Sequence, residues 1–178
     1  MPIPRPENGF TLVELLVTLA VALLLSTMAV ETFPRLLAES RMVSEVNHFV
    51  TALHLARSEA VLQARDVVLC PSHDLARCGA SRDWPAGWLL FASDDREHDP
   101  GEPLLQAGNP LESGIGMSTG NARKRIVFRP DGSSGGSNAS FTFCERRHLA
   151  RPRVICLSGS GRPRLAYTTC SGRPVACP

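Results

Sequence analysis

The sequence predicts an α+β fold in which a long N-terminal α-helix packs on a C-terminal antiparallel β-sheet domain. In the first third of the chain, apolar residues either run continuously or recur every three or four positions, which is typical of helices. After residue 64, short apolar runs alternate with clusters of Gly, Pro, Ser and Asp, which indicates strands joined by turns. A helix followed by strands makes an α+β domain.

The predicted helix has two parts. Residues 10–30 contain a single charge, Glu14, and are long enough to span a bilayer as one helix. Residues 31–64 continue it as an amphipathic helix, and we expect its apolar face to pack on the protein's own sheet. Pro34 is expected to kink or loosen the helix, because proline removes one backbone hydrogen bond. The residues of the apolar face are Val46, Phe49, Leu53, Ala56 and Ala60.

Residues 65–178 are predicted to form one β-rich globular domain. Residues 131–138 form a Gly/Ser-rich turn within it, and we expect Trp84 and Trp88 to pack in its core. The candidate strands are residues 67–70, 88–91, 104–106, 125–128, 140–144, 154–158 and 164–168.

Charge divides the chain into an acidic part and a basic part. Residues 1–120 carry 8 basic and 15 acidic side chains, a net charge of −7, whereas residues 121–178 carry 11 and 2, a net charge of +9. Such a split indicates a polyanionic partner for the C-terminal part. Charged residues make up 20% of the 178 residues and apolar residues 43%, which excludes a disordered chain and a polytopic membrane protein.

Six cysteines follow the hydrophobic segment. An even number of cysteines beyond a membrane-targeting segment predicts disulfides in an oxidising compartment. A zinc site is disfavoured, because the sequence contains no C-x2-C pair. Many connectivities are open to six cysteines. Nearness in the sequence favours the pairs Cys70–Cys78, Cys144–Cys156 and Cys170–Cys177.

Glu14 needs a physical reason, because a carboxylate within a membrane span costs about 2.5–3.5 kcal/mol on insertion scales. An ordinary membrane anchor does not explain it. A cleaved secretory signal would need a basic region first and a small-x-small site after the apolar core. Residues 1–9 instead carry one Arg and one Glu, and the carboxylate lies inside the apolar run.

Residues 9–16, with the sequence GFTLVELL, resemble the type IV prepilin motif. The resemblance implies that residues 1–9 are a leader peptide, which a prepilin peptidase removes between Gly9 and Phe10. It also implies N-methylation of the new α-amine of Phe10. Glu14 would then pair with the α-amine of a neighbouring subunit during assembly. A buried carboxylate is tolerable when a buried cation matches it.

The rest of the chain resembles the GspH/FimT family of minor pilins and pseudopilins. The resemblance lies in the order of the segments ALHLARSEAV, VVLCPS, WPAGWLLF, DPGEPLL, IVFRPDG and SFTFC. It implies a type IV pilin-like fold with disulfides, anchored by one helix in the bacterial inner membrane with its globular domain in the periplasm. The implied partners are other major and minor pilins or pseudopilins. Two functions are implied: a type IV pilus minor pilin linked to DNA uptake, and a structural minor pseudopilin of a type II secretion system.

Four arginines form two Arg-Pro-Arg triplets, Arg151 with Arg153 and Arg162 with Arg164. In an extended chain, residues two apart point to the same side, so each triplet is expected to present paired guanidinium groups to phosphates. The stretch from Gly161 to Arg164 also resembles the GRxR motif of DNA-binding FimT-type minor pilins. We expect contacts with the DNA backbone, and therefore little sequence preference. The alternatives are a solvated charged face and contacts with acidic neighbours in a filament.

The sequence predicts a non-catalytic protein without cofactor or metal. The five histidines are scattered, the cysteines are expected to form bridges, and no phosphate-binding Gly loop is present. The acidic segment at residues 94–99 does not fit an EF-hand loop. Counted from Asp95, the sixth position is proline and the twelfth is glutamine, where an EF-hand needs Gly and Glu. This mismatch favours a solvated loop. The choice between a type IV pilus and a type II secretion system stays open.

Overall fold

A computed structural model describes residues 9–93, 104–120 and 123–177, and the side chains of residues 26–31 lie outside that description. The chain divides into two compact units between Leu37 and Ala38. Helix α1 (Leu12–Gln63) contributes to both units and has Pro34 inside it. Proline therefore removes one backbone bond without ending the helix, whose last residue lies one position before the predicted one.

The first unit contains the N-terminal part of helix α1. The backbone N–H of Glu14 donates to Oγ1 of Thr11 at 3.2 Å, which satisfies one amide that the start of a helix leaves unpaired. Glu14 lies in the first turn, where the helix dipole favours negative charge. Residues 9–25 are all exposed. In the part of the chain that the structure describes, no helix combines the length and apolar character needed to cross a membrane.

The described part of the second unit contains two antiparallel four-stranded sheets. The first has the order β3-β2-β1-β5, with β1 (Asp66–Pro71), β2 (Trp88–Ser93), β3 (Leu104–Gly108) and β5 (Ile126–Phe128). The second has the order β4-β6-β7-β8, with β4 (Ile115–Gly120), β6 (Ala139–Glu145), β7 (Arg153–Leu157) and β8 (Pro163–Ala166). A short 3-10 helix, η1 (Trp84–Ala86), precedes β2.

All seven predicted strands are present with small shifts at their ends, but strand β4 was not predicted. Its sequence, IGMSTG, contains two glycines, which are weak strand formers. Ile115 and Met117 are buried in alternation with more exposed neighbours. Two apolar residues are too few to distinguish a strand from a loop by pattern alone. Pairing with β6 along its whole length makes it a strand.

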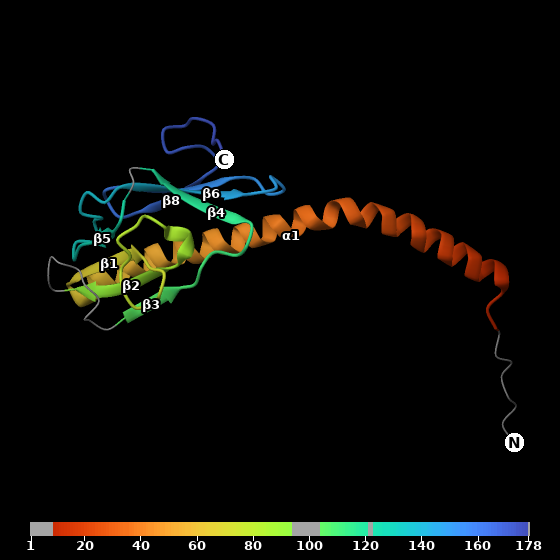
Figure 1. Ribbon diagram of the computed structural model, residues 1–178, viewed down its shortest axis with the longest axis horizontal. Helices are drawn as coiled ribbons and strands as arrows, with labels where there is room; N and C mark the ends of the chain where they lie inside the picture. Colours follow the sequence, from red (N-terminus) through yellow and green to blue (C-terminus); the bar gives the residue numbers. More distant parts are fainter. Residues whose placement is uncertain (1–8, 94–103, 121–122, 178) are drawn as a thin grey trace, which may run out of the picture. The chain divides into compact units, whose positions relative to one another are not determined.

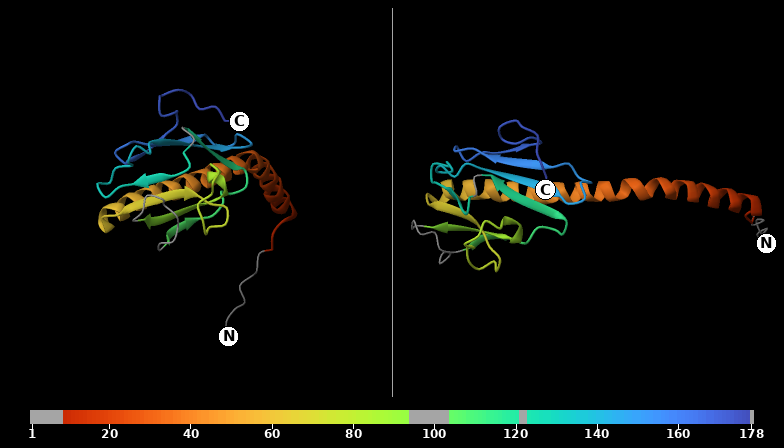
Figure 2. Two further views of the ribbon diagram at one scale, coloured as in Figure 1. Left: turned by 60° about the vertical axis from the view of Figure 1, so that its left-hand side comes forward. Right: turned by 45° about the horizontal axis from the view of Figure 1, so that its top comes forward.

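Residues 38–63 of helix α1 lie between the two sheets, as Figures 1 and 2 show. Their buried face follows the predicted spacing, which confirms that the apolar stripe packs on the protein's own sheets. Phe49 lies at the centre, with its ring in edge contact with Trp84, Trp88 and Phe141. The buried face consists of Met42, Val46, Phe49, Ala52, Leu53, Ala56 and Ala60.

Candidate functional site

The candidate site lies on the outer face of the sheet β4-β6-β7-β8. On β6, Ala139, Phe141 and Phe143 are buried in the core. Because successive side chains of a strand point to opposite faces, Ser140 points to the outer face. The strand registers place Ser140, Cys156 and Arg164 in one row across β6, β7 and β8. Directly paired residues share a face of the sheet, so Arg164 lies on the outer face beside Cys156.

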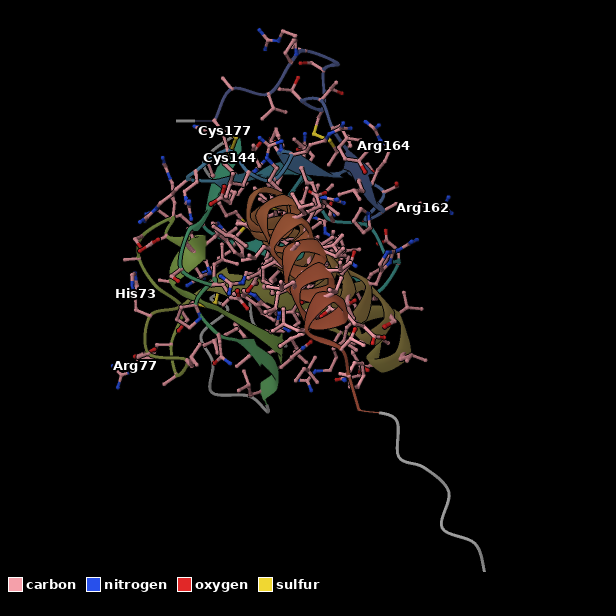
Figure 3. All side chains as sticks on the ribbon, turned by 90° about the vertical axis from the view of Figure 1, so that its right-hand side faces the viewer. His73, Arg77, Cys144, Arg162, Arg164 and Cys177 are labelled. Carbon is pink, nitrogen blue, oxygen red and sulfur yellow. A yellow bond between two sulfur atoms is a disulfide. The ribbon has the colours of Figure 1, made fainter. Side chains whose placement is uncertain are left out.

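The C-terminal segment, residues 167–177, lies over this outer face. Val175 packs against the outward-facing Val154, Cys156 and Ala166. Two disulfides, Cys156–Cys170 and Cys144–Cys177, attach the segment to β7 and β6. Figure 3 shows the second of these pairs. A third disulfide, Cys70–Cys78, joins the end of β1 to the loop that follows it.

Only one of the three cysteine pairings favoured by nearness in the sequence, Cys70–Cys78, is confirmed. The expected pairs Cys144–Cys156 and Cys170–Cys177 are wrong. Cys156 is opposite Ser140, so Cys144 lies four residues further along β6. At about 3.4 Å per residue that separation is beyond the reach of a disulfide. The C-terminal segment instead supplies one cysteine to each strand.

The turn between β7 and β8 requires glycine at position 161. Its backbone N–H donates to the carbonyl oxygen of Ser158 at 2.9 Å. Gly161 has a φ of +75°, which side-chain-bearing residues rarely adopt, and an added Cβ would collide with the carbonyl oxygen of Gly132. Gly161 is also buried. Gly161 was expected to be part of the DNA-binding motif. Its role in that motif is to shape the turn, because it has no side chain with which to contact a ligand.

Helix α1 supports this turn through the Gly/Ser-rich turn that follows β5. The Nε–H of Arg57 on α1 donates to the carbonyl oxygen of Gly132 at 3.0 Å. The hydroxyl of Ser134 donates to the carbonyl oxygen of Ser158 at 2.9 Å. The backbone that carries Arg162 is thus linked through hydrogen bonds to the rigid centre of the second unit.

A groove of about 880 Å³ opens between the β7–β8 turn, the outer face of the sheet and the C-terminal segment. Arg162, Arg164 and Arg173 line it, and none of the described residues that line it is acidic. All three arginines are exposed, and none forms an ion pair with another described residue. Figure 3 shows Arg162 and Arg164 on one side of the molecule, away from His73 and Arg77. Unpaired guanidinium groups in a groove without carboxylates attract a polyanion.

The structure gives the two Arg-Pro-Arg triplets different environments. The side chain of Arg153 is 11% exposed, and its guanidinium forms an ion pair with Glu39 of helix α1. It also lies 5.5 Å from the centre of the Tyr167 ring. Arg153 is therefore not free to form the expected paired fork. The side chain of Arg151 is exposed, while its backbone N–H donates to Glu39 at 3.1 Å.

The Glu39 carboxyl group responds to these contacts. Partial burial raises its pKa. The hydrogen bond from Arg153, the amide of Arg151 and the positive charges of both residues outweigh burial, so the pKa lies below its usual value of 4.5.

The remaining predicted site residues belong to the N-terminal segment and to one acidic segment. Gly9 and Phe10 precede helix α1 and are exposed, and Glu14 is exposed in its first turn. The acidic residues 94–99 lie outside the described residues. Among the residues that are described, no group of three or more His, Cys, Asp or Glu side chains is placed to hold a metal ion.

Sequence reasoning missed Arg173, which lines the same groove as Arg162 and Arg164. It lies nine positions after Arg164 and eleven after Arg162. Only the fold of the C-terminal segment brings it back to them. One signal was present in the sequence: the tetrapeptide Ser-Gly-Arg-Pro occurs at residues 160–163 and again at residues 171–174.

A long N-terminal helix packed on antiparallel sheets, with the motif Gly-Phe-x-x-x-Glu at its start, defines a protein of the pilin class. The family model of the type II transport protein GspH matches residues 45–161, more than half of the chain. The chain belongs to the GspH family. A model of the prokaryotic N-terminal methylation motif matches residues 4–30.

Two solved proteins share this fold. The type IV minor pilin FimU of Pseudomonas aeruginosa superposes with a TM-score of 0.57 and is 20% identical; the match covers 71% of this chain and 89% of FimU. The minor pseudopilin EpsH from the type 2 secretion system of Vibrio cholerae superposes with a TM-score of 0.50 and is 13% identical; the match covers 71% of this chain and 96% of EpsH. No curated protein matches the chain significantly.

Proposed function

We propose that the chain is a minor pilin of a type IV pilus, assembled into the filament, which binds DNA through Arg162 and Arg164. The observation that carries the proposal is the groove in which these exposed arginines meet no carboxylate of a described residue. Guanidinium groups bind phosphates well, and contacts with the backbone alone position a protein on DNA without reading its sequence. Binding is therefore non-specific.

The same proposal covers processing and location. A prepilin peptidase cleaves between Gly9 and Phe10, the new N-terminus is methylated, and residues 10–30 anchor the chain in the inner membrane. The match to the N-terminal methylation motif supports this processing. The three disulfides support a periplasmic location for the second unit, because disulfides persist in oxidising compartments. Other major and minor pilins are the partners in the filament.

Glu14 acts in assembly, by pairing with the α-amine of a neighbouring subunit. Its exposure in the first turn of the helix supports this role, because the carboxylate is accessible to another chain. Glu14→Val is expected to be inserted and cleaved like the wild type, but to be recovered less in pull-downs with other pilins. Unaltered incorporation of this variant would remove the role.

The test of DNA binding uses the full chain in a mild detergent with short double-stranded DNA over a series of salt concentrations. Binding is expected to be micromolar or weaker, with a slope of log affinity against log salt near −0.9 for each phosphate neutralised. Arg162→Ala with Arg164→Ala should flatten that slope by roughly one to two units for all sequences alike. The control is Arg77→Ala with Arg82→Ala, which removes the same charge from two exposed arginines in another loop.

Two outcomes overturn this assignment. A double variant that melts like the wild type and binds with the same slope excludes Arg162 and Arg164 as the site. A wild-type chain that binds no DNA even at low salt excludes DNA binding altogether.

The second candidate is a minor pseudopilin with a structural role in a type II secretion system. The match to the GspH family, described as type II transport proteins, favours it. The genes beside the coding sequence discriminate between the two functions: pilus genes support the first and general secretion genes the second. Co-purification with pilins or with secretion pseudopilins tests the same choice on the protein.

A further inference from the structure

The two Ser-Gly-Arg-Pro segments, residues 160–163 and 171–174, form the same turn. In the first, the N–H of Gly161 donates to the carbonyl oxygen of Ser158 at 2.9 Å, and the N–H of Ser158 donates to that of Arg162 at 3.3 Å. In the second, the corresponding bonds run from Gly172 to Thr169 at 2.8 Å and from Thr169 to Arg173 at 2.8 Å. Each of these two backbone hydrogen bonds of the first turn has its counterpart in the second.

The side chains and backbone angles match as well. The hydroxyl groups of Ser158 and Ser160 are 2.8 Å apart, and those of Thr169 and Ser171 are 3.1 Å apart. The glycine that precedes each arginine has a positive φ, +75° in the first turn and +83° in the second. Arg162 and Arg173 therefore occupy equivalent positions in two copies of one local structure.

Both turns border the same groove. Its lining includes Ser158, Gly159, Ser160 and Arg162 of the first turn, and Thr169, Cys170, Ser171 and Arg173 of the second. The row of Ser140, Cys156 and Arg164 on the outer face of the sheet lines the same groove. The three guanidinium groups thus come from the two turns and from the sheet beneath.

A disulfide fixes the second turn to this surface. Cys170 belongs to the second turn, and its partner Cys156 lies in the row that Ser140 and Arg164 complete on the sheet. The first turn is held by hydrogen bonds to the Gly/Ser-rich turn after β5, as described above. Both arginine-bearing turns are therefore fixed before any ligand arrives, which reduces the entropy lost on binding.

We propose that Arg173 is a phosphate-binding residue and that the two Ser-Gly-Arg-Pro turns clamp one nucleic-acid backbone between them. The Cys156–Cys170 disulfide is the positioning element that holds Arg173 against the groove. This inference rests on the proposed DNA-binding function. It adds a residue outside the Gly161–Arg164 stretch and makes binding depend on one particular disulfide.

The first experiment measures the salt dependence of binding of the full chain in mild detergent to a short DNA duplex. Arg173→Ala is expected to flatten the log–log slope by about one unit, as removal of one phosphate contact does. Arg77→Ala, which removes an exposed arginine from another loop, is the matched control and should leave the slope unchanged. An equal effect of both variants would show a general charge effect and would overturn the clamp.

The second experiment removes the disulfide with Cys156→Ser and Cys170→Ser, while Cys144–Cys177 still attaches the end of the segment. The loss of binding should equal that of Arg173→Ala. Adding Arg173→Ala to the disulfide variant should cause no further loss of DNA binding, because both changes remove the same contact. Cys70→Ser with Cys78→Ser, which removes a disulfide outside the groove, should bind DNA normally. Additive losses would show that the disulfide does not act through Arg173.

The outcomes separate the inference from the function on which it rests. If Arg162→Ala with Arg164→Ala weakens binding and Arg173→Ala does not, the clamp is wrong and DNA binding stands. If the wild type binds no DNA at low salt, both fall. If the disulfide variant does not give a cooperative thermal melt, the Arg173→Ala result decides alone.

Discussion

The guanidinium of Arg153 on strand β7 pairs with the carboxylate of Glu39 on helix α1, although 114 positions of sequence separate the two residues. The arginine side chain is only 11% exposed, and the face of the Tyr167 ring lies beside it. Glu39 is the second residue of the second unit. The pair therefore attaches the start of that unit's helix to the start of β7.

Arg153→Ala is expected to lower the free energy of unfolding by about 1–3 kcal/mol, because it leaves the Glu39 carboxylate without its charged partner. Arg151→Ala is the matched control. It removes the same charge from the same triplet but keeps the backbone N–H that binds Glu39, so it should change stability by no more than about 0.5 kcal/mol. Urea unfolding of both variants measures the difference. Equal destabilisation by the two changes would contradict a specific role for the pair.

Glu39 also predicts a dependence of stability on pH. Its pKa in the folded protein lies below 4.5, so the pair stabilises the fold above the pKa of the unfolded chain. That contribution is lost as pH falls through the lower, folded-state pKa. The stability difference between wild type and Glu39→Gln should therefore be largest near neutral pH and shrink as pH falls below 4.5. Thermal melts of both proteins across this range check the sign, and a difference that grows in acid would refute it.

The disulfide pattern predicts a specific peptide map. Digestion without reduction should yield linked peptides that contain Cys144 with Cys177 and Cys156 with Cys170. Mass spectrometry identifies them, and the loss of each linked mass after reduction is the control. Recovery of Cys144 linked to Cys156 would contradict the strand register.

The two glycines of the repeated turn should differ in their tolerance of alanine. Gly172→Ala meets open space, so only its positive φ opposes the change, at about 1–2 kcal/mol. Gly161→Ala carries the same backbone cost and also places a methyl group against the carbonyl oxygen of Gly132. Thermal melts should therefore show that Gly161→Ala destabilises the protein more than Gly172→Ala does. The opposite order would show that the first turn is not packed as described.

Gly9→Val should leave the leader attached in cells that contain a prepilin peptidase, because the motif places Gly9 at the cleavage position. Mass spectrometry of the wild type should show a chain that begins at methylated Phe10. The same measurement on Glu14→Val, which keeps Gly9, serves as the cleavage control. A mature chain that begins after residue 20 would instead indicate an ordinary signal peptide.

Local patterns in the sequence predicted the helix, its buried face and seven of the eight described strands. Helical and strand periods are properties of neighbouring residues, so they can be read without knowing the fold. Strand β4 was not visible, since its few apolar residues become a strand only by pairing with β6.

The sequence alone determined the pilin class of this protein, because the prepilin motif and the order of helix and strands are written along the chain. Only the tertiary structure decided which arginines stay free and which cysteines pair. Arg153 is neutralised by a helix residue far away in sequence, and Arg173 returns to the groove because Cys170 is bound to β7. Both facts depend on the register between strands and on the path of the C-terminal segment. Contacts between residues far apart in the sequence set the register and the path, and no local sequence pattern encodes those contacts.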